Sequence, residues 1–117
     1  MNLDLEGYRL HLVFSPADMR SGFRTLSAIA STCLRLDVTD GKDCVVFVSS
    51  RRNRCKAIWC DAAGASLLTR SLRKGRFQQL LARAGDGGTM VLSRKELLEF
   101  LDGASIQRPR SGFLSKV

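Results

Sequence analysis

Apolar and polar positions recur with regular periods along most of the chain, and these periods predict its strands and helices. Residues 8–14 alternate between apolar and polar side chains, which is the pattern of a half-buried strand. Between residues 16 and 36 the apolar positions recur at spacings of three and four, which predicts a long amphipathic helix that faces a sheet. Ser15 stands directly before this stretch and is followed by proline and then by aspartate, so we expect Ser15 to cap the helix.

The middle of the chain has the pattern of three consecutive strands. Residues 44–48 form a continuous β-branched and aromatic run, which is typical of a well-buried strand. Residues 55–60 resume this character after the polar, arginine-rich residues 50–54, so the two runs predict a hairpin with a basic tip. A turn at residues 61–64 precedes residues 65–72, which we interpret as a third strand, with a helix as the alternative.

The C-terminal part of the chain predicts three further elements. The apolar spacing indicates a short helix over residues 77–84, and residues 89–92 indicate a brief strand. Ser93 and Glu96 have the spacing of a capping box, which predicts a second main helix that runs to Asp102.

Together these elements predict a single α+β domain over residues 1–106, followed by a mobile polar tail over residues 107–117. The three central strands favour a mostly antiparallel sheet with a basic β-hairpin, and we expect the two main helices to pack on one face of that sheet. A length of 117 residues is typical of one domain and is sufficient for a core without disulfides or a structural metal.

The overall charge of the chain narrows the class of partner. The formal net charge is +8 and the sequence pI is about 10.1, which favours a polyanionic partner. Nucleic acid is favoured over a membrane, because no apolar run approaches the ~20 residues of a spanning helix. The first residues are acidic and lack the basic region of a signal peptide, so we expect a cytoplasmic location.

The positive charge is concentrated in residues 51–76, which contain eight basic residues and one acidic residue and so carry +7 of the net charge of +8. One interpretation is a nucleic-acid-binding hairpin, because guanidinium groups bind phosphates and a two-stranded ribbon can enter the major groove of DNA. The alternative interpretation is a solvated turn that keeps the protein soluble. Arg20, near the start of the predicted long helix, could bind the same anion or pair with a carboxylate. The candidate nucleic-acid-binding residues are Arg51, Arg52, Arg54, Lys56, Arg70, Arg73, Lys74, Arg76 and Arg20.

The residue pattern does not favour catalysis or metal binding. The four cysteines include no Cys-x-x-Cys pair, so we expect buried free thiols rather than a zinc site. His11 has no evident partner, and Asp61 heads a turn, where aspartate caps its own backbone. We therefore predict no catalytic residues, no metal ligands and no cofactor. Phe77 and Trp59 could stack on bases, but a core position is favoured for both.

Four short motifs resemble those of a known family. They are Asp18-Met-Arg-Ser-Gly-Phe23, then Val46-Phe47 with Arg51-Arg52-x-Arg54-x-Lys56, then Asp61-x-x-Gly64, and then Gly75-Arg76-Phe77. Their order and spacing within residues 8–106 are similar to those of the TnpB-type accessory protein, the second reading frame of IS66-class insertion sequences. This protein is not the RNA-guided nuclease that shares the name TnpB. The family usually has tryptophan directly before the Asp-x-x-Gly turn, where this chain has Cys60.

The resemblance implies a role in DNA transposition beside a separate, larger transposase that carries out strand transfer. Combined with the charge pattern, it leads us to expect a non-catalytic accessory protein that binds DNA through residues 51–76, either at the ends of the element or as non-specific duplex. Two alternatives stay open at this point. One is an adaptor that binds the transposase without contacting DNA, and the other is a metal-dependent nuclease.

Overall fold

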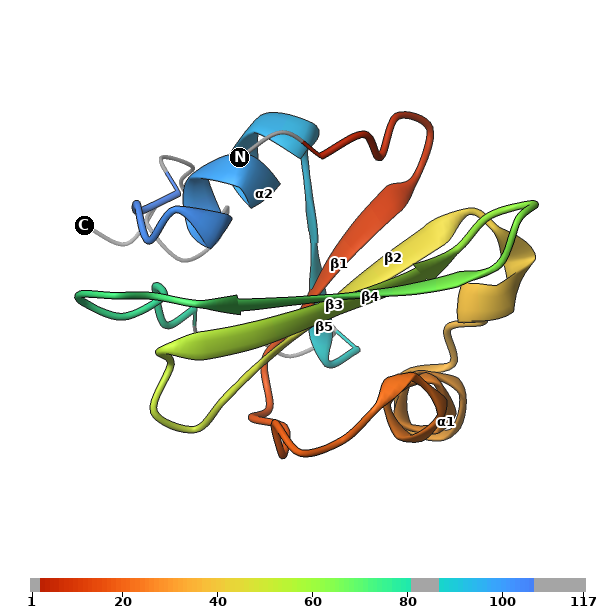
Figure 1. The fold of residues 1–117 in the computed structure, drawn as a ribbon, viewed down its shortest axis with the longest axis horizontal. Coiled ribbons are helices and arrows are strands. Elements are labelled where there is room, and N and C mark those ends of the chain that lie inside the picture. The colour runs from red at the N-terminus through yellow and green to blue at the C-terminus, as the bar shows by residue number, and fades with distance from the viewer. Residues whose placement is uncertain (1–2, 81–86, 107–117) are drawn as a thin grey trace.

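The computed structural model describes residues 3–80 and 87–106, which form one sheet with a helix on each side (Figure 1). The helices are α1 (Phe23–Leu34) and α2 (Arg94–Leu101), and a short 3-10 helix, η1 (Val38–Asp40), leads into the second strand. The strands are β1 (Arg9–Val13), β2 (Asp43–Val48), β3 (Arg54–Cys60), β4 (Ala65–Ser71) and β5 (Thr89–Leu92).

The strand order is β4-β3-β2-β1-β5, so the first strand of the chain lies between β2 and β5. The pairs β2–β3, β3–β4 and β1–β5 are antiparallel, whereas β1 and β2 are parallel. A parallel pair cannot be joined by a tight turn, and here α1 lies in the long crossover connection. The α+β class, the mostly antiparallel sheet and the basic hairpin are therefore confirmed.

The two helices lie on opposite faces of the sheet, which corrects the expectation that both pack on one face (Figure 1). Phe100 of α2 belongs to the core cluster that contains Val46, whereas Leu26 of α1 belongs to the cluster that contains Phe47. Successive residues of β2 point to opposite faces, so every residue of this strand is buried. The unbroken apolar run at residues 44–48 reflects this burial of β2 on both faces of the sheet.

Helix α1 begins later than the sequence predicts. Its N-cap is Gly22 and not Ser15, and Gly22 offers no side-chain hydrogen bond. The preceding residues form an irregular connection, in which the N–H of Ala17 donates to the carbonyl of Val48 over 2.9 Å. The carboxylate of Asp18 accepts hydrogen bonds within this connection instead of at a helix start. The hydrogen bond from Ala17 to Val48, at the end of β2, keeps this segment out of the helix.

Helix α2 begins as predicted, at a capping box. The Ser93 hydroxyl accepts from the N–H of Glu96 over 3.1 Å, and the Glu96 carboxylate accepts from the N–H of Ser93 over 2.7 Å. The short helix expected over residues 77–84 does not form at residues 77–80, which are irregular. Its remaining residues and the predicted tail lie outside the described residues, so the division into domain and tail stays a prediction.

Buried His11 and Asp43, together with the exposed Arg9, form a cluster that joins β1 to β2. His11 Nε2 lies 2.8 Å from Asp43 Oδ1, and the Arg9 Nε donates to the same oxygen over 2.9 Å. His11 and Asp43 are both buried, so β1 is covered on two faces rather than half-buried. Burial opposes the charge on Asp43, but the hydrogen bonds with Arg9 and His11 hold its pKa at about 2.

Candidate nucleic-acid interface

The β2–β3 hairpin ends in a tight polar tip. The N–H of Ser49 donates to the carbonyl of Arg54 over 2.9 Å, and the N–H of Arg52 donates to the carbonyl of Ser49 over 2.9 Å. Arg52 has a φ of 57°, a left-handed conformation that is uncommon for a residue other than glycine and that allows the chain to reverse here. These bonds fix the backbone of the tip, while the side chain of Arg51 stays exposed.

The loop that follows β4 lies beside this tip. The N–H of Leu72 donates to the carbonyl of Asn53 over 2.9 Å, and the N–H of Phe77 donates to the carbonyl of Arg52 over 2.6 Å. The first bond continues the β3–β4 pairing beyond the ends of both strands, and the second attaches the end of the loop to the hairpin tip. Residues 73–76 therefore lie next to the hairpin tip at one end of the sheet (Figure 1).

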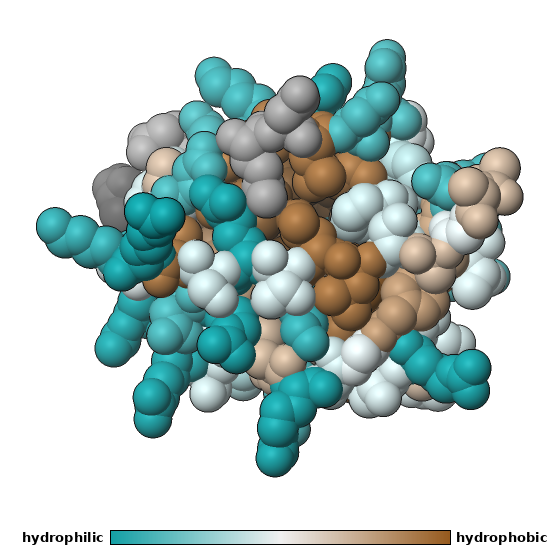
Figure 2. All heavy atoms as spheres, in the orientation of Figure 1, coloured by the Kyte–Doolittle hydropathy of each residue, from teal (hydrophilic) through white to brown (hydrophobic). Residues whose placement is uncertain are grey.

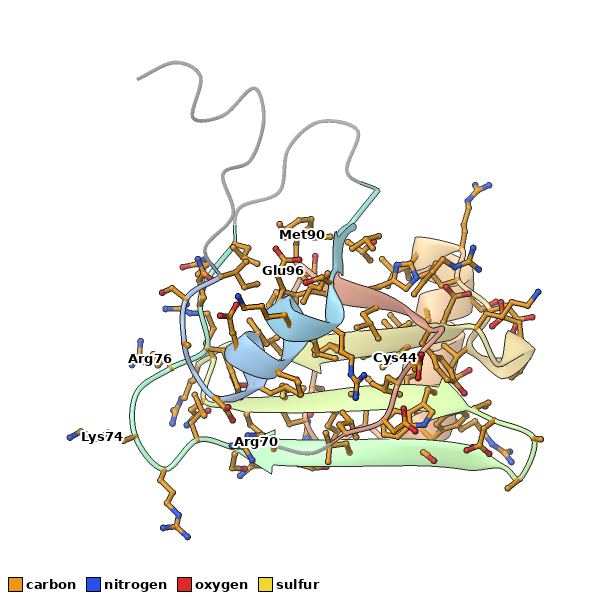
Figure 3. The ribbon with its side chains drawn as sticks, turned by 90° about the horizontal axis from the view of Figure 1, so that it is seen from above. Cys44, Arg70, Lys74, Arg76, Met90 and Glu96 are labelled. Carbon is orange, nitrogen blue, oxygen red and sulfur yellow. The ribbon has the colours of Figure 1, made fainter. Side chains whose placement is uncertain are left out.

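The two loops together present five exposed cations, which we call the basic end: Arg51, Arg54, Arg73, Lys74 and Arg76. Figure 3 shows Lys74 and Arg76 pointing outward from their loop. In the described part of the chain, the side-chain hydrogen bonding of this group is limited to Arg54 Nε, which donates to the Ser71 hydroxyl over 3.2 Å. Most of this charge is therefore available to an external anion.

A shallow hollow of about 430 Å³ adjoins the basic end. It is lined by the hairpin tip, including Arg51 and Asn53, and by the connection that carries Asp18 and Arg20. Arg20 Nη2 lies 2.8 Å from the Asp18 carboxylate, and its hydrogen bonds hold the pKa of Asp18 at about 2. Arg20 thus lies near the basic end but is already paired with a carboxylate. Asn53 was not among the predicted site residues. Its position between Arg52 and Arg54 in a predicted turn is the sequence feature that could have identified it.

Three of the predicted residues are half-buried and are not among the exposed cations of the basic end. Arg70 Nε donates to the last carbonyl of α2 over 2.6 Å, and its Nη2 lies 3.1 Å from the Asp102 carboxylate. The half-buried Lys56 donates to the carbonyl of Ser21 over 2.7 Å, which joins β3 to the connection before α1. The Nε of Arg52 is buried without a hydrogen-bond partner. These side chains hold elements of the fold together, or are covered by them.

The Gly75-Arg76-Phe77 motif fixes the position of Arg76, one of the exposed cations. Gly75 has a φ of 79°, which favours glycine. The Phe77 side chain is buried and stacks on Phe100 with ring centroids 5.1 Å apart. Arg76 is held exposed between this turn and this anchor. Phe77 is therefore a core residue, as expected, and Trp59 likewise packs against the core beneath α2.

The described residues outside the basic end offer little reactive chemistry. They include no group of three or more His, Cys, Asp or Glu side chains that could hold a metal. The Asp61 carboxylate caps its own turn, accepting from the N–H groups of residues 63 and 64 over 2.8 and 3.0 Å. Burial raises the pKa of the Cys44 and Cys55 thiols to about 12, so both are protonated at neutral pH. None of the described helices has the length and apolar character needed to span a membrane.

Comparison with known proteins decides the family. The model of the family described as IS66 Orf2 like protein matches residues 8–111. The chain belongs to this family. Among curated proteins, an uncharacterized protein of Sinorhizobium fredii, y4jC, is 34% identical over 71 residues, which span 61% of this IS66 Orf2-like chain and 60% of y4jC. No solved structure matches.

Family membership confirms the resemblance carried by the four motifs. Three of these motifs have structural explanations. Asp61-x-x-Gly64 forms the capped turn between β3 and β4, and Gly75-Arg76-Phe77 anchors the loop beside the hairpin tip. The arginine motif at residues 51–56 supplies the hairpin tip and the start of β3.

Proposed function

We propose that this protein binds DNA through its basic end, as a non-catalytic accessory of insertion-sequence transposition that acts beside the transposase. The observation that carries the proposal is the convergence of five exposed cations from two loops that are distant in sequence but joined by backbone hydrogen bonds. A cluster of like charge on one end of a sheet favours a polyanion.

The arrangement of the basic end suits the phosphates of duplex DNA. Arg51 and Arg54 come from the tip of the β2–β3 hairpin, which β4 and the loop after it flank on one side. The cations of residues 73–76 come from the neighbouring loop and would reach the flanking phosphates. Guanidinium groups bind phosphates through two parallel hydrogen bonds, which would fix the orientation of the tip on the duplex.

The positions of Asp18 and Asp61 support binding rather than phosphoryl transfer. Asp18 lines the adjoining hollow, and its carboxylate is bound by Arg20. Asp61 follows the opposite end of β3 from the hairpin tip and caps a turn. Metal-dependent hydrolysis needs carboxylates that converge on one point, and these two do not. A nuclease activity is therefore not part of the proposal.

Binding measured as a function of salt tests the proposed interface. If about four to five cations of the basic end contact phosphates, the logarithm of the affinity should fall with the logarithm of salt at a slope of about −4. The triple variant Arg51→Ala, Arg54→Ala, Arg76→Ala should flatten this slope by up to about 3. Fluorescence anisotropy with a duplex from the element's end and a scrambled duplex of equal length measures both the slope and any sequence preference.

A matched triple variant removes the same charge elsewhere. Lys42→Ala, Arg94→Ala, Lys95→Ala alters exposed residues outside the basic end and should retain the wild-type slope. Equal slopes for the two triple variants would overturn the proposed interface. If the purified chain binds no DNA but retains the transposase after nuclease treatment, the adaptor function replaces the DNA-binding one.

A further inference from the structure

Strand β4 forms one border of the sheet, and no other described strand lies outside it (Figure 3). All seven of its residues pair with β3, from Ala65 opposite Cys60 to Ser71 opposite Arg54. The strand is therefore regular along its full length and contains no bulge. Its second edge presents backbone N–H and C=O groups that another strand could bind.

The ends of the β3–β4 hairpin fix which residues face outward. The N–H of Asp61 donates to the carbonyl of Gly64, and the N–H of Leu72 donates to the carbonyl of Asn53. Residues that hydrogen-bond across an antiparallel pair alternate along each strand, so the even-numbered residues of β4 bond to β3. The residues whose backbone groups point outward are Ala65, Leu67, Thr69 and Ser71.

This outer edge lacks the features that usually protect a sheet border. The chain contains 19 lysines and arginines, yet the four outward residues are uncharged and include no proline. Leu67 is 37% exposed, which is high for a leucine. Arg70 is the one charged residue of β4. Its side chain lies on the opposite face of the sheet from the side chains of these four residues and is bound to the end of α2. Figure 2 looks onto this edge, where hydrophobic and uncharged residues occupy much of the middle and strongly hydrophilic side chains project mainly from the rim.

We propose that a second copy of this chain docks on this edge, β4 against β4 in antiparallel orientation, and continues the sheet across a two-fold axis. With the axis at Leu68, Leu67 of one copy lies opposite Thr69 of the other, and Ala65 lies opposite Ser71. All of the outward residues then pair with outward residues, and no like charges lie opposite each other.

Charge complementarity at the two ends of β4 favours this occupant. The turn that begins at Asp61 precedes the strand, and the exposed Arg73 and Lys74 follow it. Antiparallel docking places the start of one β4 beside the end of the other, so Asp61 of each copy approaches Arg73 and Lys74 of its neighbour. Asp61 is the one acid among residues 51–76. The opposite border, β5, has four residues and leads directly into α2, so it offers a shorter edge.

Sedimentation equilibrium of the full chain without DNA tests the dimer, at about 0.15 M salt so that the net charge of each copy is largely screened. The wild-type mass should rise with concentration towards twice 12.9 kDa. Thr69→Pro removes an N–H that points outward, so the β3–β4 pairing is kept and two bonds per dimer are lost. The dissociation constant should rise at least about tenfold.

Two further variants keep the test decisive if Thr69→Pro alters the fold. Leu67→Lys brings two like charges close to the axis and should also shift the protein to monomer, whereas Val91→Lys, at an exposed position of β5, should leave the dimer intact. Circular dichroism confirms that each variant is folded. A wild-type monomer at every concentration overturns the proposal, as does a dimer that Val91→Lys dissociates and Leu67→Lys does not. Because no DNA is present, these outcomes are independent of the proposed DNA binding.

Discussion

The backbone N–H of Phe77 donates a hydrogen bond of 2.6 Å to the carbonyl of Arg52. This bond joins the loop after β4 to the hairpin tip, although 24 residues separate the two partners in sequence. The ring of Phe77 is buried and stacks on Phe100. The arrangement of the basic end therefore depends on a core aromatic side chain that cannot itself contact DNA.

Removing this anchor should affect both stability and DNA binding. We expect Phe77→Ala to lower the free energy of unfolding by about 3–5 kcal/mol, since it leaves a cavity beside Phe100. Where the variant is still folded, the salt slope of DNA binding should flatten by up to about 3, because residues 73–76 lose their fixed position. Urea unfolding and anisotropy measure the two effects, with Phe77→Leu as the milder control. An unchanged slope in folded Phe77→Ala would show that the loop does not need this anchor.

Arg70 and Arg73 are three residues apart and should behave in opposite ways. Arg70→Ala removes two hydrogen bonds between β4 and the end of α2, so it should destabilise the protein by about 1–2 kcal/mol. It should leave the salt slope of DNA binding unchanged. Arg73→Ala should change stability by less than about 0.5 kcal/mol and flatten the slope by about 0.9. If the two variants flatten the slope equally, the assignment of Arg70 to the fold is wrong.

Acid should destabilise the protein through Asp43. Its pKa is about 2 in the folded chain and about 3.9 in an unfolded one, so its charge stabilises the fold above pH 4. This contribution, on the order of 2 kcal/mol, should be lost as the pH falls from about 4 to about 2. Urea unfolding across this range should show a smaller loss in Asp43→Asn than in the wild type.

Asp18 provides the matched control for this pH dependence. Its pKa is also held at about 2, but the pair with Arg20 is exposed, so water screens the interaction. Asp18→Asn should therefore retain nearly the full acid-induced loss of stability. A loss that disappears in Asp18→Asn and persists in Asp43→Asn would contradict the role given to the buried cluster.

The sequence predicted most of the elements because each has a local signal. The alternating residues of β1, the apolar run of β2 and the capping box of α2 all depend on near neighbours, and these elements form where expected. The start of α1 was misplaced, because Ser15 has the local chemistry of a cap but the bond from Ala17 to Val48 holds the segment against β2. That bond is long-range, and no local pattern contains it.

The candidate site was predictable as a charge cluster but not as a surface. Residues 51–76 were identified from charge alone, yet the direction of each side chain depends on the strand register. Arg54 and Arg70 lie on neighbouring strands but belong to opposite faces, because their positions in the β3–β4 register differ by one. The placement of the helices on separate faces likewise depends on β1 pairing with both β2 and β5, which no local period specifies.

Strand β1 is the first strand to be synthesised, but one of its two neighbours in the sheet, β5, is the last of the described strands. It pairs through residues 9–12 with residues 43–46 and through residues 10–13 with residues 89–92. On the ribosome, one edge of β1 therefore stays open until nearly the whole described chain has emerged, and contacts of such long range form slowly. A reading frame interrupted after the hairpin would still encode every arginine of the tip, but not the strand that closes the sheet. Its product would be a basic chain whose sheet lacks β5, and it would be prone to aggregation and proteolysis. Mutations that truncate the 3′ end of the gene would therefore remove the folded protein while the arginines of the hairpin tip were still encoded.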